Sequence, residues 1–141
     1  MKTLTLTISV IFLSVFISVG ASWANYTEDN SELPSNTITA IEHVEHGTWI
    51  GTDKGLTYFD GSIWVTYTDE MSLLPDNHVH DLHHDVFGNT WVATNEGLVR
   101  IDDDGNWSVF NSSNSDLPSN NIRSVSTDSE GSVWIGTWGA G

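Results

Sequence analysis

The densest group of chemically capable side chains is the stretch HVHDLHHD at residues 78–85, with four histidines and two aspartates. Imidazoles and carboxylates at close spacing can bind zinc or another transition metal. In a strand, however, only every second side chain shares a face. The metallohydrolase pattern HxHxDH also needs Asp at position 82, where the chain has Leu82. We therefore expect a strand with outward polar positions here, and we predict no metal site.

A second candidate is the acidic stretch IDDDGNW at residues 101–107, which could hold calcium. An EF-hand loop requires Glu at its twelfth position, and residue 113 is Ser, so a tight turn is expected instead. DVFGNTW and DSEGSVW resemble the Asp-box turn of sialidase propellers, with one residue too many. A sialidase also needs several arginines, and the chain has Arg100 and Arg123 alone. We predict no catalytic residue and no cofactor.

The elements that must position these side chains are repeated. Trp49, Trp91 and Trp134 lie 42 and 43 residues apart, in TWIGT, TWVAT and VWIGT. The motifs LPSN, LPDN and LPSN recur in step, which divides the chain into repeats of about 34–74, 75–117 and 118–141.

Each complete repeat holds four short runs of β-branched and aromatic residues, separated by Gly, Asp and Asn. This pattern predicts four strands per repeat. In the first repeat we expect them near residues 37–43, 48–52, 56–60 and 63–68.

The fourth strand indicates the architecture. Trp64 and Tyr67 are three residues apart and so lie on opposite faces, as do Trp107 and Phe110. Both faces must then be covered, which radially stacked four-stranded blades of about 40–45 residues achieve. A β-solenoid is the alternative, but its repeats are shorter. We predict an all-β fold, a β-propeller of four-stranded antiparallel blades.

The chain carries about two and a half such blades, an incomplete ring. Its third repeat reaches Gly141 where earlier repeats continue with Leu and two further strands. Closed propellers need about four to eight blades, so we expect a fragment of a longer protein with exposed blade faces. The residues Trp23 to Tyr26 have the spacing of Trp64 to Tyr67, and we expect them to resemble the end of an outer strand.

The first residues predict export. Lys2, an apolar run over residues 4–19 and small residues up to Ser22 form the layout of a signal peptide, residues 1–24, cut after Ala24 or possibly Ala21. An uncleaved membrane anchor is the alternative, but the run is short for a span of about 20 apolar residues. We expect a mature chain of residues 25–141, periplasmic or secreted, without stable membrane insertion.

The composition of the chain indicates how it is stabilised and which classes of molecule it can bind. The chain has no cysteine, so burial alone must stabilise it. The chain has four Lys and Arg residues and nineteen Asp and Glu residues, which give a formal net charge of −15. Such a surface repels phosphate backbones, and we expect no nucleic acid partner.

The repeat unit, read as NxIxxI, DxxGxxWIGT, GLxxFD, WxxY and LPxN, resembles the two-component regulator propeller repeat over residues 25–141. The resemblance implies a seven-bladed ring, often two in tandem, in the extracytoplasmic sensor region of bacterial hybrid histidine kinases and related secreted proteins. It also implies recognition of an extracellular ligand, in several cases a glycan fragment. The chain differs in having few blades and no kinase or DNA-binding part.

We expect a ligand to bind at one face of the ring. If strands run up and down within each blade, the LPxN loops and the loops between second and third strands share that face. The candidate ligand-binding residues on it are Asn36, Asp53, Lys54, Asn77, His78, Asn95, Glu96, Asn120 and Trp138. Trp138 could stack on a sugar ring or pack against the next blade. The three LPxN asparagines are expected to fix the turn that enters each blade.

We therefore predict a non-catalytic, ligand-binding sensor propeller for a small molecule or glycan, the N-terminal part of a two-component sensor, completed by the remaining blades of a longer chain. Alternatives are a fragment of a propeller-fold polysaccharide lyase or hydrolase, and a protein-interaction scaffold.

Overall fold

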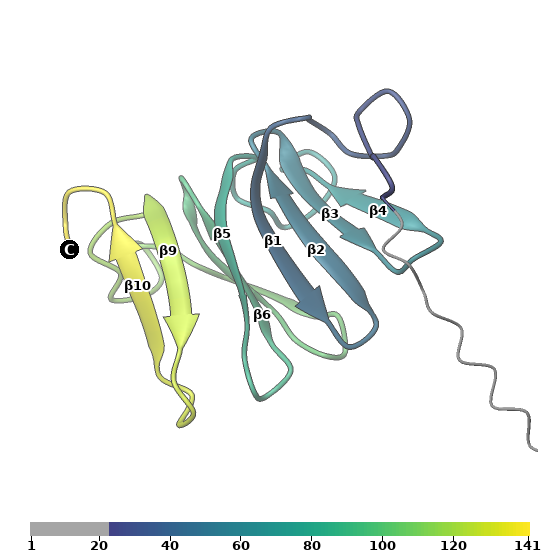
Figure 1. Ribbon diagram of the computed structural model, residues 1–141. Coiled ribbons are helices and arrows are strands. Elements are labelled where there is room, and N and C mark those ends of the chain that lie inside the picture. Colours follow the sequence, from purple (N-terminus) through teal and green to yellow (C-terminus); the bar gives the residue numbers. More distant parts are fainter. Residues whose placement is uncertain (1–22) are drawn as a thin grey trace, which may run out of the picture.

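The computed structural model describes residues 23–141, which form ten β-strands in three antiparallel sheets (Figure 1). Nearly all of the predicted signal peptide lies outside these residues. The strands are β1 (Ile38–Val44), β2 (Gly47–Thr52), β3 (Gly55–Phe59), β4 (Trp64–Tyr67), β5 (Val79–His84), β6 (Thr90–Thr94), β7 (Gly97–Ile101), β8 (Trp107–Phe110), β9 (Ile122–Thr127) and β10 (Val133–Thr137). Neighbours in sequence pair within each sheet, in the orders β1-β2-β3-β4, β5-β6-β7-β8 and β10-β9. We call these sheets blades one, two and three.

The predicted strands of the first repeat are confirmed to within a residue or two, because turn residues delimit them. The β2–β3 and β6–β7 turns end in Gly55 and Gly97, with φ of 147° and 151°. A Cβ at Gly55 would lie 2.8 Å from the Tyr67 carbonyl oxygen, and one at Gly97 would lie 2.7 Å from that of Phe110. The GL pair of the repeat therefore needs glycine for both its backbone conformation and the close approach of the fourth strand.

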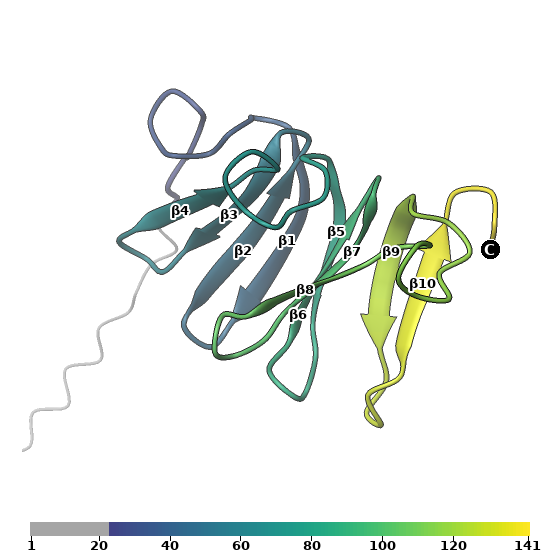
Figure 2. The ribbon, with the colours of Figure 1, turned by 180° about the vertical axis from the view of Figure 1, so that it is seen from behind.

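The blades follow one another along an arc, as both views of the ribbon show (Figures 1 and 2). The first strand of each blade packs across the first two strands of the blade before it: β5 lies against β1 and β2, and β9 against β5 and β6. This succession of stacked sheets is the arrangement of a propeller, here an open arc, and it confirms the predicted fold class.

The core consists of two layers between blades. Blades one and two enclose the buried residues Trp49, Leu56, Leu74, Val79, Leu82, Val92, Val99 and Ile101. Blades two and three enclose Trp91, Ala93, Leu98, Ile122 and Val125. Blade two is covered on both faces, so β6 is buried along its whole length. This burial matches the expectation drawn from aromatic residues on both faces of the fourth strand.

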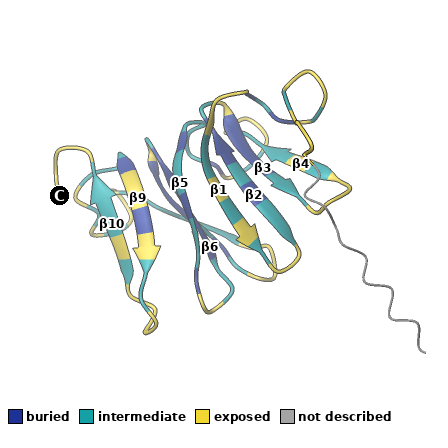
Figure 3. Cartoon of the chain, in the orientation of Figure 1, coloured by how far each residue is buried: buried dark blue, intermediate teal, exposed yellow. Residues whose placement is uncertain are grey.

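Equivalent residues in the outer blades differ in exposure, as the exposed segments of β1 and β10 show (Figure 3). Trp49 and Trp91 are 8% exposed, whereas Trp134 at the same repeat position is 67% exposed. Leu82 and Val125 are 6% and 5% exposed, whereas the equivalent Ile41 is 65% exposed. Both end blades therefore present apolar faces to solvent.

The segment before blade one repeats the connection between blades. Tyr26 packs on Trp64 with ring centroids 5.1 Å apart, and Tyr67 packs on Trp107 at the same 5.1 Å. Tyr26 thus occupies the place of the last residue of an outer strand, as the sequence predicted, although residues 23–26 form no strand themselves.

Candidate functional site

The predicted shared face is present at one end of the arc. Ile38 pairs with Thr52 and Val79 with Thr94, so each first strand begins beside the point where the second strand ends. The loops between blades and the β2–β3 and β6–β7 turns therefore lie together, and we call this the loop end. The opposite end carries the β1–β2 and β5–β6 turns, and we call it the turn end.

Asn95 is the centre of a hydrogen-bonded network at the loop end. Its Oδ1 lies 2.8 Å from His80 Nε2 and accepts a hydrogen bond of 3.3 Å from Asn121 Nδ2. Its Nδ2 donates to Asp76 Oδ1 at 3.0 Å. Residues of the β6–β7 turn, the start of β5 and the approach to β9 thereby meet at one point.

Arg123 extends this network across blades two and three. Its Nη1 lies 3.3 Å from His80 Nδ1, and its guanidinium carbon lies 5.1 Å from the centroid of the Trp138 ring. The His78 ring lies 4.4 Å from that of His80. We call the seven residues the loop-end network: Asp76, His78, His80, Asn95, Asn121, Arg123 and Trp138.

The electrostatics of the network favour a neutral His80. Burial lowers the pKa of His80, the hydrogen bond with Asn95 raises it, and the positive charge of Arg123 lowers it again, with a net result below the ordinary value. A neutral imidazole can accept a hydrogen bond from Arg123 through Nδ1 while Nε2 donates to Asn95. Arg123 is exposed, so its other guanidinium N–H groups can donate to a ligand at the edge of the network.

Unsatisfied hydrogen-bonding capacity also gathers at the loop end. Five side-chain atoms of the described residues are buried without a partner, and four of them lie at the loop end: Thr39 Oγ1, Asp53 Oδ1, Asn121 Oδ1 and Thr137 Oγ1. The fifth is Arg100 Nε on β7. Thr39 and Asp53 are the blade-one equivalents of His80 and Asn95. Since buried polar atoms in proteins nearly always have partners, these atoms mark places where water or a ligand can bind.

The candidate residues divide into three groups. His78, Asn95 and Trp138 belong to the loop-end network. The LPxN asparagines hold the loops between blades: the Oδ1 atoms of Asn36, Asn77 and Asn120 accept the backbone N–H of Glu28, Asp69 and Ser112 at 2.9, 2.9 and 2.8 Å. Asp53 and Lys54 lie in the β2–β3 turn, and Glu96 lies in the β6–β7 turn next to Asn95.

Sequence reasoning missed Asp76, His80, Asn121 and Arg123. A signal was available for two of them, because His80 and Arg123 occupy the same repeat position, one residue after the buried Val79 and Ile122. Strand alternation directs such positions away from the core.

The rest of the histidine-rich stretch, from Asp81 to His84, makes separate contacts within and between blades. Asp81 Oδ2 accepts the backbone N–H of Val125 at 2.9 Å, and His83 Nε2 lies 2.9 Å from Thr127 Oγ1. His84 Nδ1 contacts Thr90 Oγ1 at 3.1 Å within blade two. Within residues 23–141, no group of three His, Cys, Asp or Glu residues is placed to hold a metal ion.

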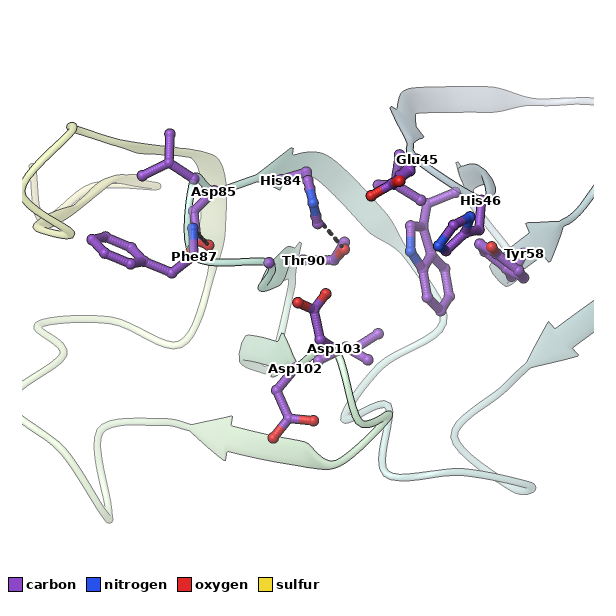
Figure 4. Close-up of a pocket in the computed structure, with 14 residues that line it drawn as sticks. Glu45, His46, Tyr58, His84, Asp85, Phe87, Thr90, Asp102 and Asp103 are labelled. Carbon is purple, nitrogen blue, oxygen red and sulfur yellow. Dashed lines mark hydrogen bonds between the residues drawn. The ribbon is translucent and has the colours of Figure 1, made fainter.

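A cavity of about 670 Å³ lies at the turn end, between blades one and two (Figure 4). Figure 4 shows His84, Thr90 and Asp103 on one side of it and Glu45, His46 and Tyr58 on the other. The sequence did not point to this cavity, because its walls come from turns of two different blades.

Comparison with known proteins agrees with this architecture. Residues 116–139 match the family model described as two component regulator propeller. The third repeat of this chain is similar to the two-component regulator propeller repeat. Blades one and two have the same order of strands and turns as the matched repeat. No curated protein matches the chain.

Solved structures show the same propeller arrangement. One similar structure is the extracellular domain of the hybrid two component system BT3049 from B. thetaiotaomicron. The match covers 80% of this chain, with a TM-score of 0.71 and 27% sequence identity. Two structures of the extracellular domain of BT4673 from B. thetaiotaomicron are also similar, and both have a TM-score of 0.58. The one described as a hybrid two component system is 22% identical over 72% of this chain. The one described as a one component system is 17% identical over 82% of this chain. At these identities the latter two support the fold alone.

The propeller chain spans 16%, 14% and 15% of the lengths of these three structures. Residues 23–141 include no helix long and apolar enough to cross a membrane.

Proposed function

We propose that this chain is part of a non-catalytic extracellular sensor propeller that recognises a small polar ligand, a glycan being the favoured class, at its loop end. The observation that carries the proposal is the loop-end network, where seven side chains from two blades meet and one buried atom, Asn121 Oδ1, has no hydrogen-bond partner. The similarity to the extracellular domain of a hybrid two component system supports a sensory role and a periplasmic or secreted location.

The chemistry of the loop end suits a sugar. Asp76 offers carboxylate acceptors, Asn95 and Asn121 offer amide groups, and Arg123 offers several donors, which together match the hydroxyls of a polyol. The Trp138 side chain is 72% exposed and can stack on the apolar face of a sugar ring. The net charge of −15 favours neutral over polyanionic ligands.

The test uses the purified chain and a panel of neutral oligosaccharides, with binding followed by calorimetry and tryptophan fluorescence. We expect at least one oligosaccharide to bind. Arg123→Ala and Trp138→Ala should each weaken that binding by about tenfold or more, equivalent to about 1.4 kcal/mol.

Two sets of controls locate the site. Ile63→Ala changes an exposed apolar side chain in the β3–β4 turn, outside the network, and should leave binding unchanged. Glu45→Gln and Asp103→Asn change the turn-end cavity and should also leave binding unchanged. If the cavity variants lose binding and the Arg123 variant does not, the loop-end assignment is wrong. If no oligosaccharide binds, the glycan assignment is wrong.

A further inference from the structure

The turn-end cavity carries polar groups that the loop-end network does not use. Its volume is about 670 Å³, and its lining residues come from blades one and two, so both of its walls belong to this chain. Ligand sites in proteins have volumes of about 300–1,000 Å³. The cavity is therefore large enough to hold a small molecule.

The first group of interest is the indole N–H of Trp49, which lines the cavity. The equivalent tryptophans of the other blades donate to an aspartate of their own blade. The Trp91 indole donates to Asp85 Oδ2 at 2.9 Å, and the Trp134 indole donates to Asp128 Oδ2 at 3.3 Å. Each of these aspartates begins the turn between the first and second strands of its blade.

Blade one lacks this acceptor because its first turn is shorter. The β1–β2 turn consists of Glu45 and His46, whereas the β5–β6 turn spans residues 85–89. The Trp49 indole N–H makes no hydrogen bond within residues 23–141, yet it is not enclosed by protein like the five buried atoms without partners. Since Trp49 is only 8% exposed and lines the cavity, a nearly buried donor is free to bind a ligand there.

The second feature is the negative charge of the cavity. Among the described residues, its lining includes no Lys or Arg and four carboxylates: Glu45, Asp85, Asp102 and Asp103. Asp85 and Asp102 each accept a backbone N–H of their own turn at 2.8 Å. The exposed carboxylates of Glu45 and Asp103 make no hydrogen bond or ion pair within the described part of the chain.

The two free carboxylates lie on opposite sides of the cavity (Figure 4). The Asp103 carboxylate is set against the β5–β6 turn, in the space that a Cβ on Gly88 would need. A protonated amine can donate hydrogen bonds to both carboxylates. The Trp49 indole N–H needs an acceptor, which an ammonium group lacks, so the ligand must also carry an oxygen such as a hydroxyl.

We propose that the turn-end cavity binds a small primary amine that also carries hydroxyl groups, of the amino sugar or amino alcohol class. Glu45 and Asp103 hold its ammonium group, and one of its hydroxyl oxygens accepts the Trp49 indole N–H. The site and its ligand differ from those of the loop end, so the outcome is independent of neutral glycan binding there.

The experiment is an NMR titration of the isotope-labelled, purified chain with glucosamine at neutral pH, where its amine is largely protonated. Glucose, which has a hydroxyl in place of the amine, is the matched neutral compound. We expect glucosamine to shift the Trp49 indole N–H signal and to bind about tenfold or more tightly than glucose. Trp49→Phe identifies that signal, because the variant lacks it.

Charge variants locate the site. Glu45→Gln and Asp103→Asn should each weaken glucosamine binding about fivefold or more. Since both side chains are exposed, the variants should fold, which circular dichroism can verify. Glu130→Gln removes one negative charge from an exposed position in the β9–β10 turn, outside the cavity, and should bind glucosamine like the original chain.

Three results would overturn the proposal. The first is that glucosamine binds no more tightly than glucose. The second is that glucosamine shifts other indole signals and leaves the Trp49 signal in place. The third is that Glu130→Gln weakens binding as much as the cavity variants, which would show a general attraction of cations to the net charge of −15.

Discussion

At the scale of single residues, Asp85 organises the β5–β6 turn through hydrogen bonds. Its Oδ1 accepts the backbone N–H groups of Phe87 and Asn89 at 2.9 and 2.8 Å, and its Oδ2 accepts the Trp91 indole N–H at 2.9 Å. Burial raises the pKa of Asp85, but the hydrogen bonds from Trp91 and Asn89 outweigh it and the pKa lies below its usual range. Asp128 repeats the pattern with the Trp134 indole.

We expect Asp85→Ala to lower the free energy of unfolding by about 2–4 kcal/mol, because it leaves a buried indole N–H and backbone amides without acceptors. Urea denaturation measures this change. Asp102→Ala is the control, since Asp102 accepts from the exposed Asn106 and holds no indole, and its loss should be smaller. Equal losses would show that the bond to Trp91 contributes little.

The aspartates of these turns also predict acid sensitivity. Hydrogen bonds lower the pKa values of Asp60, Asp85, Asp102 and Asp128 below the ordinary value of 3.8. A carboxyl whose pKa is lower in the folded chain stabilises it above the unfolded pKa, and this stability is lost as pH falls through the folded pKa.

We therefore expect the urea midpoint to fall steeply below about pH 4. The urea midpoint should be measured at high salt, because salt screens the repulsion among the acidic groups. In Asp85→Asn the acid-dependent loss should be smaller. A midpoint that rises on acidification below pH 4 would contradict the assignment.

At the scale of elements, the small third residue of each WIGT-type strand makes room for the next blade. A Cβ at Gly51 would lie 2.6 Å from Val79 Cγ1, on the first strand of blade two. The equivalent Ala93 is fully buried. At Gly136 in blade three, a Cβ would meet the Ser124 Oγ instead, and a serine side chain can rotate away.

We expect Gly51→Val to destabilise the chain by about 1–3 kcal/mol, because it overpacks the interface between blades. Gly136→Val should cost less at the equivalent position, where no following blade is packed. Urea denaturation of the two variants compares them directly. A larger loss for the Gly136 variant would argue against the packing of β5 on β2.

At the scale of the whole molecule, stability is concentrated in the interfaces between blades. Leu82→Ala should lower the free energy of unfolding by about 2–5 kcal/mol, since Leu82 is buried between blades one and two. Ile41→Ala, at the same repeat position on an exposed face, should cost less than about 1 kcal/mol. Chemical denaturation tests both, and similar losses would contradict the blade arrangement.

The sequence by itself determined the strands, turns and blade fold of this protein. Those features depend on local chemistry repeated at a fixed spacing, such as Gly55 in a turn that needs its φ, or Trp64 and Tyr67 on opposite faces of one strand. The role of the LPxN asparagines followed from the same local reasoning. The sequence also predicted exposed blade faces, but the tertiary structure decided how far each repeated residue is buried, because burial depends on the neighbouring blade: Trp91 is covered and Trp134 is not. It also decided which polar groups meet, since His80, Asn95 and Arg123 come together where β9 packs against β5, a contact that residue spacing does not encode.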